Sequence, residues 1–157
     1  MDVQQRKAAL RQELIDAQAE LLAVLDRVGP NDWSRPSPAE GWALRDVLTH
    51  LATAESGFVG VLKKMASGGG GVSQDFDPNR WNAGQLRRRG DASVEQLRAE
   101  LVAAHQEMLA VLEGLDEAAL NQRGRLSTGG EGNVDDLLNL VARHKRSHTD
   151  DLAAALA

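Results

Sequence analysis

The sequence has 157 residues, a formal net charge of −5 and no cysteine. This length suits one domain with a buried core, and the lack of cysteine excludes disulfides, thiolate metal ligands and cysteine nucleophiles. The acidic balance is atypical of nucleic-acid-binding proteins, no apolar run approaches a membrane span, and the N-terminus does not resemble a signal peptide. We therefore expect a single cytoplasmic domain over residues 1–157 that binds neither nucleic acid nor membranes.

The first predicted helix spans residues 2–28. Its apolar residues recur at steps of three and four, which places them on one helical face. Gly29 and Pro30 follow and end the helix. The next segment is a loop rich in proline and serine, bracketed by Trp33 and Trp42, and we expect both rings to pack on the end of the domain.

The second predicted helix covers residues 43–66. Its apolar stripe consists of Leu44, Val47, Leu48, Leu51, Phe58, Leu62 and Met65. His50 falls at the edge of this stripe, whereas Glu55 projects near its centre. Because a buried carboxylate needs a partner, Glu55 either reaches solvent or an arginine, or it supports a metal-binding histidine, as carboxylates commonly do.

A long glycine-rich connection follows, beginning with residues 67–71. It is not a phosphate-binding P-loop, because no Gly-Lys-Ser/Thr follows the glycines. Further along the connection, Phe76 and Trp81 favour a segment that packs over a pocket, although an ordinary crossover connection is an equal alternative.

The third predicted helix begins at Ser93, with Gln96 as its capping-box partner. Its stripe consists of Leu97, Leu101, Met108 and Leu112. His105 falls at the margin of this stripe, where a hydrogen-bonded structural histidine is more common than a metal ligand. Gly114 ends the helix, and we expect a short helical turn over residues 115–120 and a flexible loop over residues 127–132.

The fourth predicted helix is capped by Asn133, and Asp135 and Asp136 in its first turn complement the helix dipole. His144 and His148 lie four residues apart and so share a face. That face also carries Val134, Leu137, Val141 and Leu152. Two imidazoles in the middle of an apolar face need partners. One metal ion would satisfy both, as in the helical HxxxH motif of zinc proteases, and hydrogen bonds to neighbouring helices are the alternative.

Four amphipathic helices joined by loops, two of them long, predict an all-α fold: a four-helix bundle with long crossover loops. Bundles of this kind build metal sites from residues on facing helices. If the second and fourth helices face each other, His50 joins His144 and His148 in a three-histidine site for a divalent ion.

Two stretches carry a family resemblance: GWALRDVLTHLATAE at residues 41–55 and ARHKRSH at residues 142–148. They resemble the signatures of the DinB/YfiT-like superfamily, which includes the N-terminal domain of mycothiol-dependent maleylpyruvate isomerases. The resemblance implies a bundle that binds one divalent ion, often zinc or nickel, through His50, His144 and His148. Some relatives have a carboxylate in place of His144. The chain ends soon after the last helix, so we expect no second domain of the kind found in some isomerases.

Characterised members of that superfamily are S-transferases or isomerases that use a low-molecular-weight thiol such as mycothiol or bacillithiol. Three neutral imidazoles would also leave a divalent ion with open positions, as in catalytic sites. Our first hypothesis is therefore metal-assisted transfer of an external thiol, held as thiolate, to a small-molecule electrophile. Glu55 would orient a histidine or shuttle a proton. Arg143 and Arg146 would bind a carboxylate of the thiol or substrate, unless they are plain solvated helix residues.

Two alternatives use the same residues. In the first, the metal activates water and the protein is a hydrolase. In the second, the bundle is a non-catalytic stress protein that binds a metal or small molecule, with a homodimer formed through an exposed helix face. The sequence does not separate these alternatives, because the same three ligands serve each of them.

Overall fold

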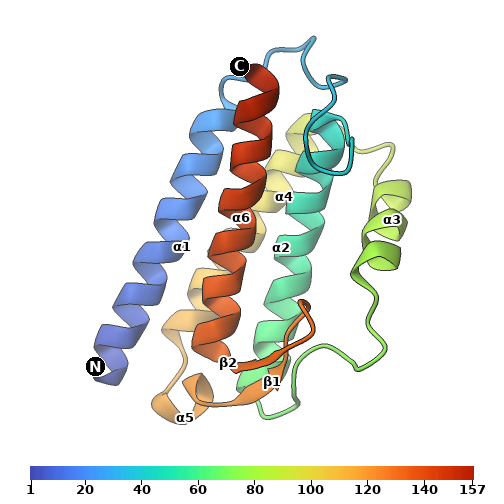
Figure 1. The fold of residues 1–157 in the computed structure, drawn as a ribbon. Helices are drawn as coiled ribbons and strands as arrows, with labels where there is room; N and C mark the ends of the chain where they lie inside the picture. The colour runs from blue at the N-terminus through green and yellow to red at the C-terminus, as the bar shows by residue number, and fades with distance from the viewer.

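Four long helices form the bundle in the computed structural model, which describes all residues 1–157. They are α1 (Val3–Leu25), α2 (Leu44–Ala66), α4 (Val94–Glu113) and α6 (Val134–Leu156). Figure 1 shows α1 and α6 running in one direction and α2 and α4 in the other, so the connection from α2 to α4 must cross back along the bundle. The predicted four-helix bundle with long crossover connections is confirmed. None of the helices combines the length and apolar character that a bilayer crossing requires.

The connections contain four shorter elements: α3 (Pro78–Arg88), α5 (Glu117–Leu120), β1 (Arg123–Arg125) and β2 (Glu131–Asn133). The two strands pair antiparallel, with Gly124 opposite Gly132. We expected loops where α3 and the hairpin lie, and this prediction was wrong. α3 begins with the Asp77 cap and Pro78, but the helix is strongly polar on average and buries no residue, so it lacks the buried apolar stripe that identifies the long helices. The strands are three residues long and consist of arginine, glycine, glutamate and asparagine, which are not typical strand formers.

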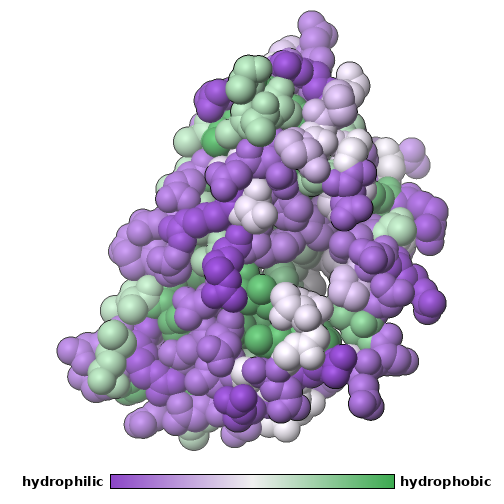
Figure 2. All heavy atoms as spheres, viewed as in Figure 1, coloured by the Kyte–Doolittle hydropathy of each residue, from purple (hydrophilic) through white to green (hydrophobic).

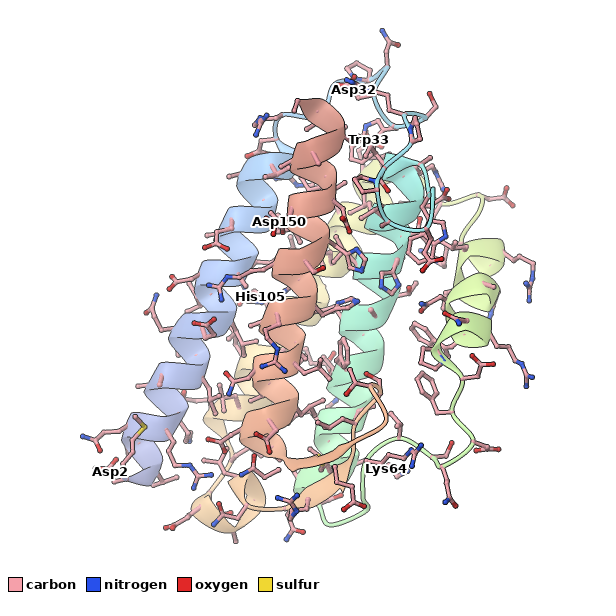
Figure 3. All side chains as sticks on the ribbon, viewed as in Figure 1. Asp2, Asp32, Trp33, Lys64, His105 and Asp150 are labelled. Atoms are coloured by element: carbon pink, nitrogen blue, oxygen red, sulfur yellow. The ribbon has the colours of Figure 1, made fainter.

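The ends of the long helices largely follow the predicted signals. Ser93 forms a capping box with Gln96, Gly114 is the C-cap of α4, and Asn133 caps α6. The first helix ends at Leu25, three residues earlier than predicted. Trp33 and Trp42 are half-buried against the apolar core at the end of the bundle, as expected, and Figure 3 labels Trp33 there.

The core consists of two apolar clusters. One includes Leu14, Leu62, Met108 and Val141, and the other includes Leu21, Leu48, Leu101 and Leu152. Between them along the helices lies a group of buried polar side chains near Lys145 and Glu55, with one member from each bundle helix: Gln18, Glu55, His105 and Lys145. We call these four residues the polar layer. Its presence shows that the interior of the bundle is not uniformly apolar at the level of the candidate site.

Lys145 and Glu55 form the centre of the polar layer. Lys145 Nζ donates hydrogen bonds to Glu55 Oε1 at 3.0 Å and to Gln18 Oε1 at 2.7 Å, and the Lys145 and Glu55 side chains are only 2% and 3% exposed. Burial by itself raises the pKa of Glu55, but the neighbouring His105 and the Lys145 ammonium outweigh it and hold that pKa below its ordinary value. Burial lowers the pKa of Lys145, and Glu55 offsets part of that effect. The pair is therefore a buried ion pair whose members depend on each other.

The buried face of α6 differs from the predicted one. It passes through Ala142, Lys145 and Thr149, whereas His144 and His148 are half-buried beside it. Our prediction that the two histidines occupy the middle of the core face was wrong. Lys145 stands about 100° around the helix from His144, and its counter-charge on α2 lets a lysine take the central position.

The hairpin packs closely on the loop that follows α2, and this contact gives a first testable prediction. A Cβ atom at Gly124 would lie 2.3 Å from Gly71 N and 2.7 Å from Met65 Sδ. We expect Gly124→Ala to lower the free energy of unfolding by about 2 kcal/mol, because backbone must move to admit the methyl group. Urea unfolding measures the change.

Gly130→Ala is the matched control, because a Cβ there meets nothing within 4 Å. This substitution should leave the midpoint of unfolding nearly unchanged. Equal effects of the two substitutions would show that the packing of the hairpin against the loop contributes nothing to stability.

Candidate metal centre

The fold brings the three predicted histidines together. His50 comes from α2, and His144 and His148 come from α6, which lies beside α2 (Figure 1). One ring nitrogen from each residue can be chosen so that all three lie within 4.8 Å of one another. The Nε2 atoms of His50 and His144 are 2.8 Å apart. The juxtaposition expected from the bundle topology is therefore present.

Aromatic rings hold these imidazoles in place. The Trp42 ring centroid lies 5.2 Å from that of His50 and 6.5 Å from that of His148. The Phe58 centroid lies 5.6 Å from that of His144 in an edge-on arrangement. Trp42 is positioned because it lies just before the start of α2, and Phe58 lies two turns beyond His50 on the same helix. Packing of this kind restricts ring rotation before any ligand arrives.

Asp151 gives His148 a fixed hydrogen-bonding partner. The two residues are three apart on α6, and Asp151 Oδ2 lies 3.1 Å from His148 Nδ1. A carboxylate can only accept here, so Nδ1 carries the proton and Nε2 keeps its lone pair for a ligand. Our prediction from the sequence did not include Asp151, although its spacing of three residues from a candidate ligand was visible.

Removing Asp151 tests this arrangement. We expect Asp151→Ala to weaken zinc or nickel binding by about 10–100-fold, because His148 loses the partner that fixes its tautomer and orientation. Titration calorimetry on untagged protein measures the change. Asp150→Ala is the control, since Asp150 is the exposed neighbour on α6 and makes no hydrogen bond or ion pair there (Figure 3). Unchanged affinity in Asp151→Ala would exclude the orienting role.

The protonation of the three histidines suits a cation. Burial, reinforced by the charge of neighbouring His148, lowers the pKa of His50 to about 4. Burial and the two neighbouring histidines lower the pKa of His144 to about 3. Burial also lowers the pKa of His148, although Asp151 opposes it. All three rings are therefore neutral at neutral pH and present lone pairs.

The geometry also fits a divalent ion. Tetrahedral zinc with Zn–N bonds of about 2.0–2.1 Å would separate its ligand nitrogens by about 3.3 Å, which is comparable with the present nitrogens, all within 4.8 Å of one another. His50 Nδ1 is buried without a hydrogen-bond partner, so the protein gives this ring no polar partner other than the histidine cluster. Imidazole nitrogens suit zinc and nickel among the common divalent ions. The three residues therefore fit such an ion.

The histidines lie on the wall of a cavity of about 750 Å³. The cavity lies between the bundle and the segment that carries α3, and Figure 2 shows hydrophobic side chains on the floor of a hollow there. Phe76 and Trp81 line it, which supports the first of the two alternatives for this segment, that it packs over a pocket. A Cβ at Gly57 of α2 would lie 3.3 Å from the Trp81 ring, so this glycine makes room for it.

The other predicted site residues lie away from the cavity. Glu55 faces the bundle interior, where it contacts Lys145 and His105 rather than the three histidines. His105 belongs to the polar layer, where Figure 3 labels it, and not to the histidine cluster. Arg146 forms ion pairs with Glu13 and Glu20 of α1. Arg143 is exposed and forms no ion pair. Neither arginine lines the cavity.

The fold and the site together define a class of protein: a four-helix bundle with a crossover between parallel helices and a three-histidine cluster on a cavity wall. Within that class, the chain belongs to the DinB superfamily, whose family model matches residues 13–152. No functionally curated protein matches the sequence.

Solved structures support the fold. YfiT from Bacillus subtilis, described as a probable metal-dependent hydrolase with an unusual four-helix bundle topology, is 19% identical with a TM-score of 0.78, and the match covers 95% of this chain and 85% of YfiT. A mycothiol-dependent maleylpyruvate isomerase is 14% identical with a TM-score of 0.76, and the match covers 97% of this chain. A DinB-like protein from Bacillus subtilis is 15% identical with a TM-score of 0.64, covering 94% of this chain and 90% of that one. The chain spans only 61% of the isomerase.

Proposed function

We propose that this protein is a divalent-metal-dependent enzyme that transfers a small-molecule thiol to an electrophile. The observation that carries the proposal is the position of the three neutral histidines on the wall of a cavity large enough for a small molecule. They form the one cluster of three or more potential ligands in the chain. Because only three protein ligands would hold it, a bound zinc or nickel ion would keep positions open toward the cavity.

Each group of residues at the site has a distinct proposed role. His50, His144 and His148 would hold the ion, and Asp151 orients His148. Trp42 and Phe58 restrict the rings, while Phe76 and Trp81 contribute apolar surface to the cavity. When bound, a divalent cation supplies positive charge that favours the deprotonated, nucleophilic form of a thiol beside it. Because the chain has no cysteine, that thiol must come from solution.

A structural neighbour adds support for thiol chemistry, since it is a mycothiol-dependent isomerase. We therefore propose mycothiol or a similar low-molecular-weight thiol as the co-substrate. Glu55 is not proposed to act on the substrate, since its contacts lie in the bundle interior.

The test is a rate measurement on untagged protein loaded with zinc or nickel. Chlorodinitrobenzene serves as the electrophile, with a series of small thiols that includes mycothiol. We expect the rate to rise above the uncatalysed rate as the thiol concentration increases, and to fall to that background in chelator or in His148→Ala. A loaded protein that leaves the background rate unchanged with every thiol would reject the transferase.

Hydrolysis is a second candidate, and the likeness to YfiT favours it. The match covers 85% of YfiT but only 61% of the isomerase. The same three ligands can serve a site that activates water. Hydrolysis of nitrophenyl acetate without any thiol separates the two candidates. Turnover that is lost in His148→Ala and is indifferent to thiol would favour the hydrolase over the transferase.

A further inference from the structure

The aromatic residues of this chain are concentrated around one cavity. The sequence has three tryptophans, two phenylalanines and no tyrosine. Four of these five residues line the cavity beside the histidines, namely Trp42, Phe58, Phe76 and Trp81. Trp33 is the exception, and it packs on the end of the core instead.

The large apolar side chains on the α3 side of the cavity are not part of the folded core. Phe76, Trp81 and Leu86 are half-buried, and they pack against neither of the two apolar clusters. α3 itself buries no residue. Their apolar surface faces the cavity, so a ligand there would cover hydrophobic area that the fold leaves open.

Apart from the three histidines, the polar groups of the cavity are uncharged except for one carboxylate. Asn79, Asn82, Ser127 and Thr128 line it, and Glu40 is its one acidic residue. No lysine or arginine is among the lining residues. Arg87 and Arg88 of α3 are exposed outside the cavity, and Arg146 is paired with glutamates of α1.

From these observations we propose that the part of the cavity away from the histidines binds a neutral, aromatic or similarly flat apolar substrate in preference to a carboxylate or other anion. The proposal rests on the proposed function only in taking this cavity as the substrate site. Rings on the bundle wall and on the α3 segment supply stacking surfaces. The asparagines, Ser127 and Thr128 can hydrogen-bond a carbonyl or hydroxyl group. Away from the histidines, an anion would lose its hydration without meeting a cationic side chain, and Glu40 would repel it.

A pair of fluorescent probes tests this inference. N-phenyl-naphthylamine is neutral, and anilinonaphthalene sulfonate has the same ring system with one added sulfonate. Both are titrated into the untagged full-length chain in chelator, so that no metal charge attracts the sulfonate. We expect the neutral probe to bind at least about tenfold more tightly than the anionic one.

Three variants make the test specific to the cavity. Trp81→Ala should weaken binding of the neutral probe by about tenfold, because one stacking surface is lost. Arg88→Ala, on the exposed side of the same helix, should bind both probes as the unaltered chain does. Asn82→Lys should strengthen sulfonate binding and reverse or abolish the preference, because it adds the missing positive charge.

Equal or tighter binding of the sulfonate probe to the unaltered chain would overturn the inference. So would an absence of neutral-probe binding, or neutral binding that Trp81→Ala leaves intact. The probes report on the cavity without metal or turnover. A chain that prefers the neutral probe but fails the thiol-transfer assay would therefore reject the proposed function alone, and a thiol transferase without this preference would reject the substrate class alone.

Discussion

Glu55→Gln is expected to lower the free energy of unfolding by about 3–5 kcal/mol, the usual effect of removing one partner from a buried ion pair. The substitution keeps the shape of the side chain but removes the negative charge that lies 3.0 Å from Lys145 Nζ. The Lys145 ammonium is then left in the bundle interior with uncharged amide oxygens, those of Gln18 and of the substituted side chain, and with no counter-charge. Small domains are stable by about 5–15 kcal/mol, so the loss should be obvious in urea unfolding.

Two further variants test whether the loss of stability comes from burial of the ion pair and from the unpaired charge that Glu55→Gln leaves. Glu107→Gln breaks the exposed Lys63–Glu107 ion pair, and we expect a loss of at most about 1 kcal/mol. The double variant Glu55→Gln/Lys145→Met removes both buried charges and should recover most of the stability lost in Glu55→Gln. If Glu55→Gln and Glu107→Gln behaved alike, the polar layer would have no special energetic role.

Zinc is expected to stabilise the metal-free chain by about 2.7 kcal/mol when its free concentration is about 100 times the dissociation constant. The reason is that the three histidines come together only in the folded protein, where they lie on two different helices. Thermal or urea unfolding with and without zinc measures the change. His148→Ala should remain folded, because the two apolar clusters contain none of the three histidines, and it should lose the stabilisation by zinc.

His105→Gln is the informative control for that experiment. His105 belongs to the polar layer and lies outside the histidine cluster, so this variant should be less stable from the outset yet still gain stability from zinc. A response to zinc that survives in His148→Ala but is lost in His105→Gln would reverse the ligand assignment.

The bundle could be predicted from sequence because its long helices carry strong and conventional signals. The apolar steps of α2, the Ser93 capping box and the Asn133 cap each locate an element within a few residues. Asp77 and Pro78 do signal the start of α3, but α3 buries no apolar stripe that would confirm a helix, and the strands of the hairpin are short and polar. α3 packs against α2, and the hairpin packs against the end of α2 and the loop that follows it. The order of residues in the sequence does not show these contacts.

The candidate site could be predicted only in part, for a related reason. The spacing of His144 and His148 was visible in the sequence, and His50 joined them once a bundle was assumed. The role of Lys145 was not visible, since a lysine among charged residues reads as solvent-exposed until Glu55 on another helix supplies its counter-charge. For the aromatic cavity, the sequence indicated only that Phe76 and Trp81 could pack over a pocket. The other lining residues could not be predicted, because the walls come from segments far apart in the chain.

The metal content of the purified, untagged protein tests the central claim most directly. Elemental analysis is made on the unaltered chain and on His144→Ala/His148→Ala, each after incubation with zinc or nickel and removal of free metal. The structure predicts about one divalent ion per chain, lost in the double variant, because the three histidines form one cluster. An unaltered chain that retains no metal, or a double variant that retains as much as the unaltered chain, would contradict the three-histidine centre.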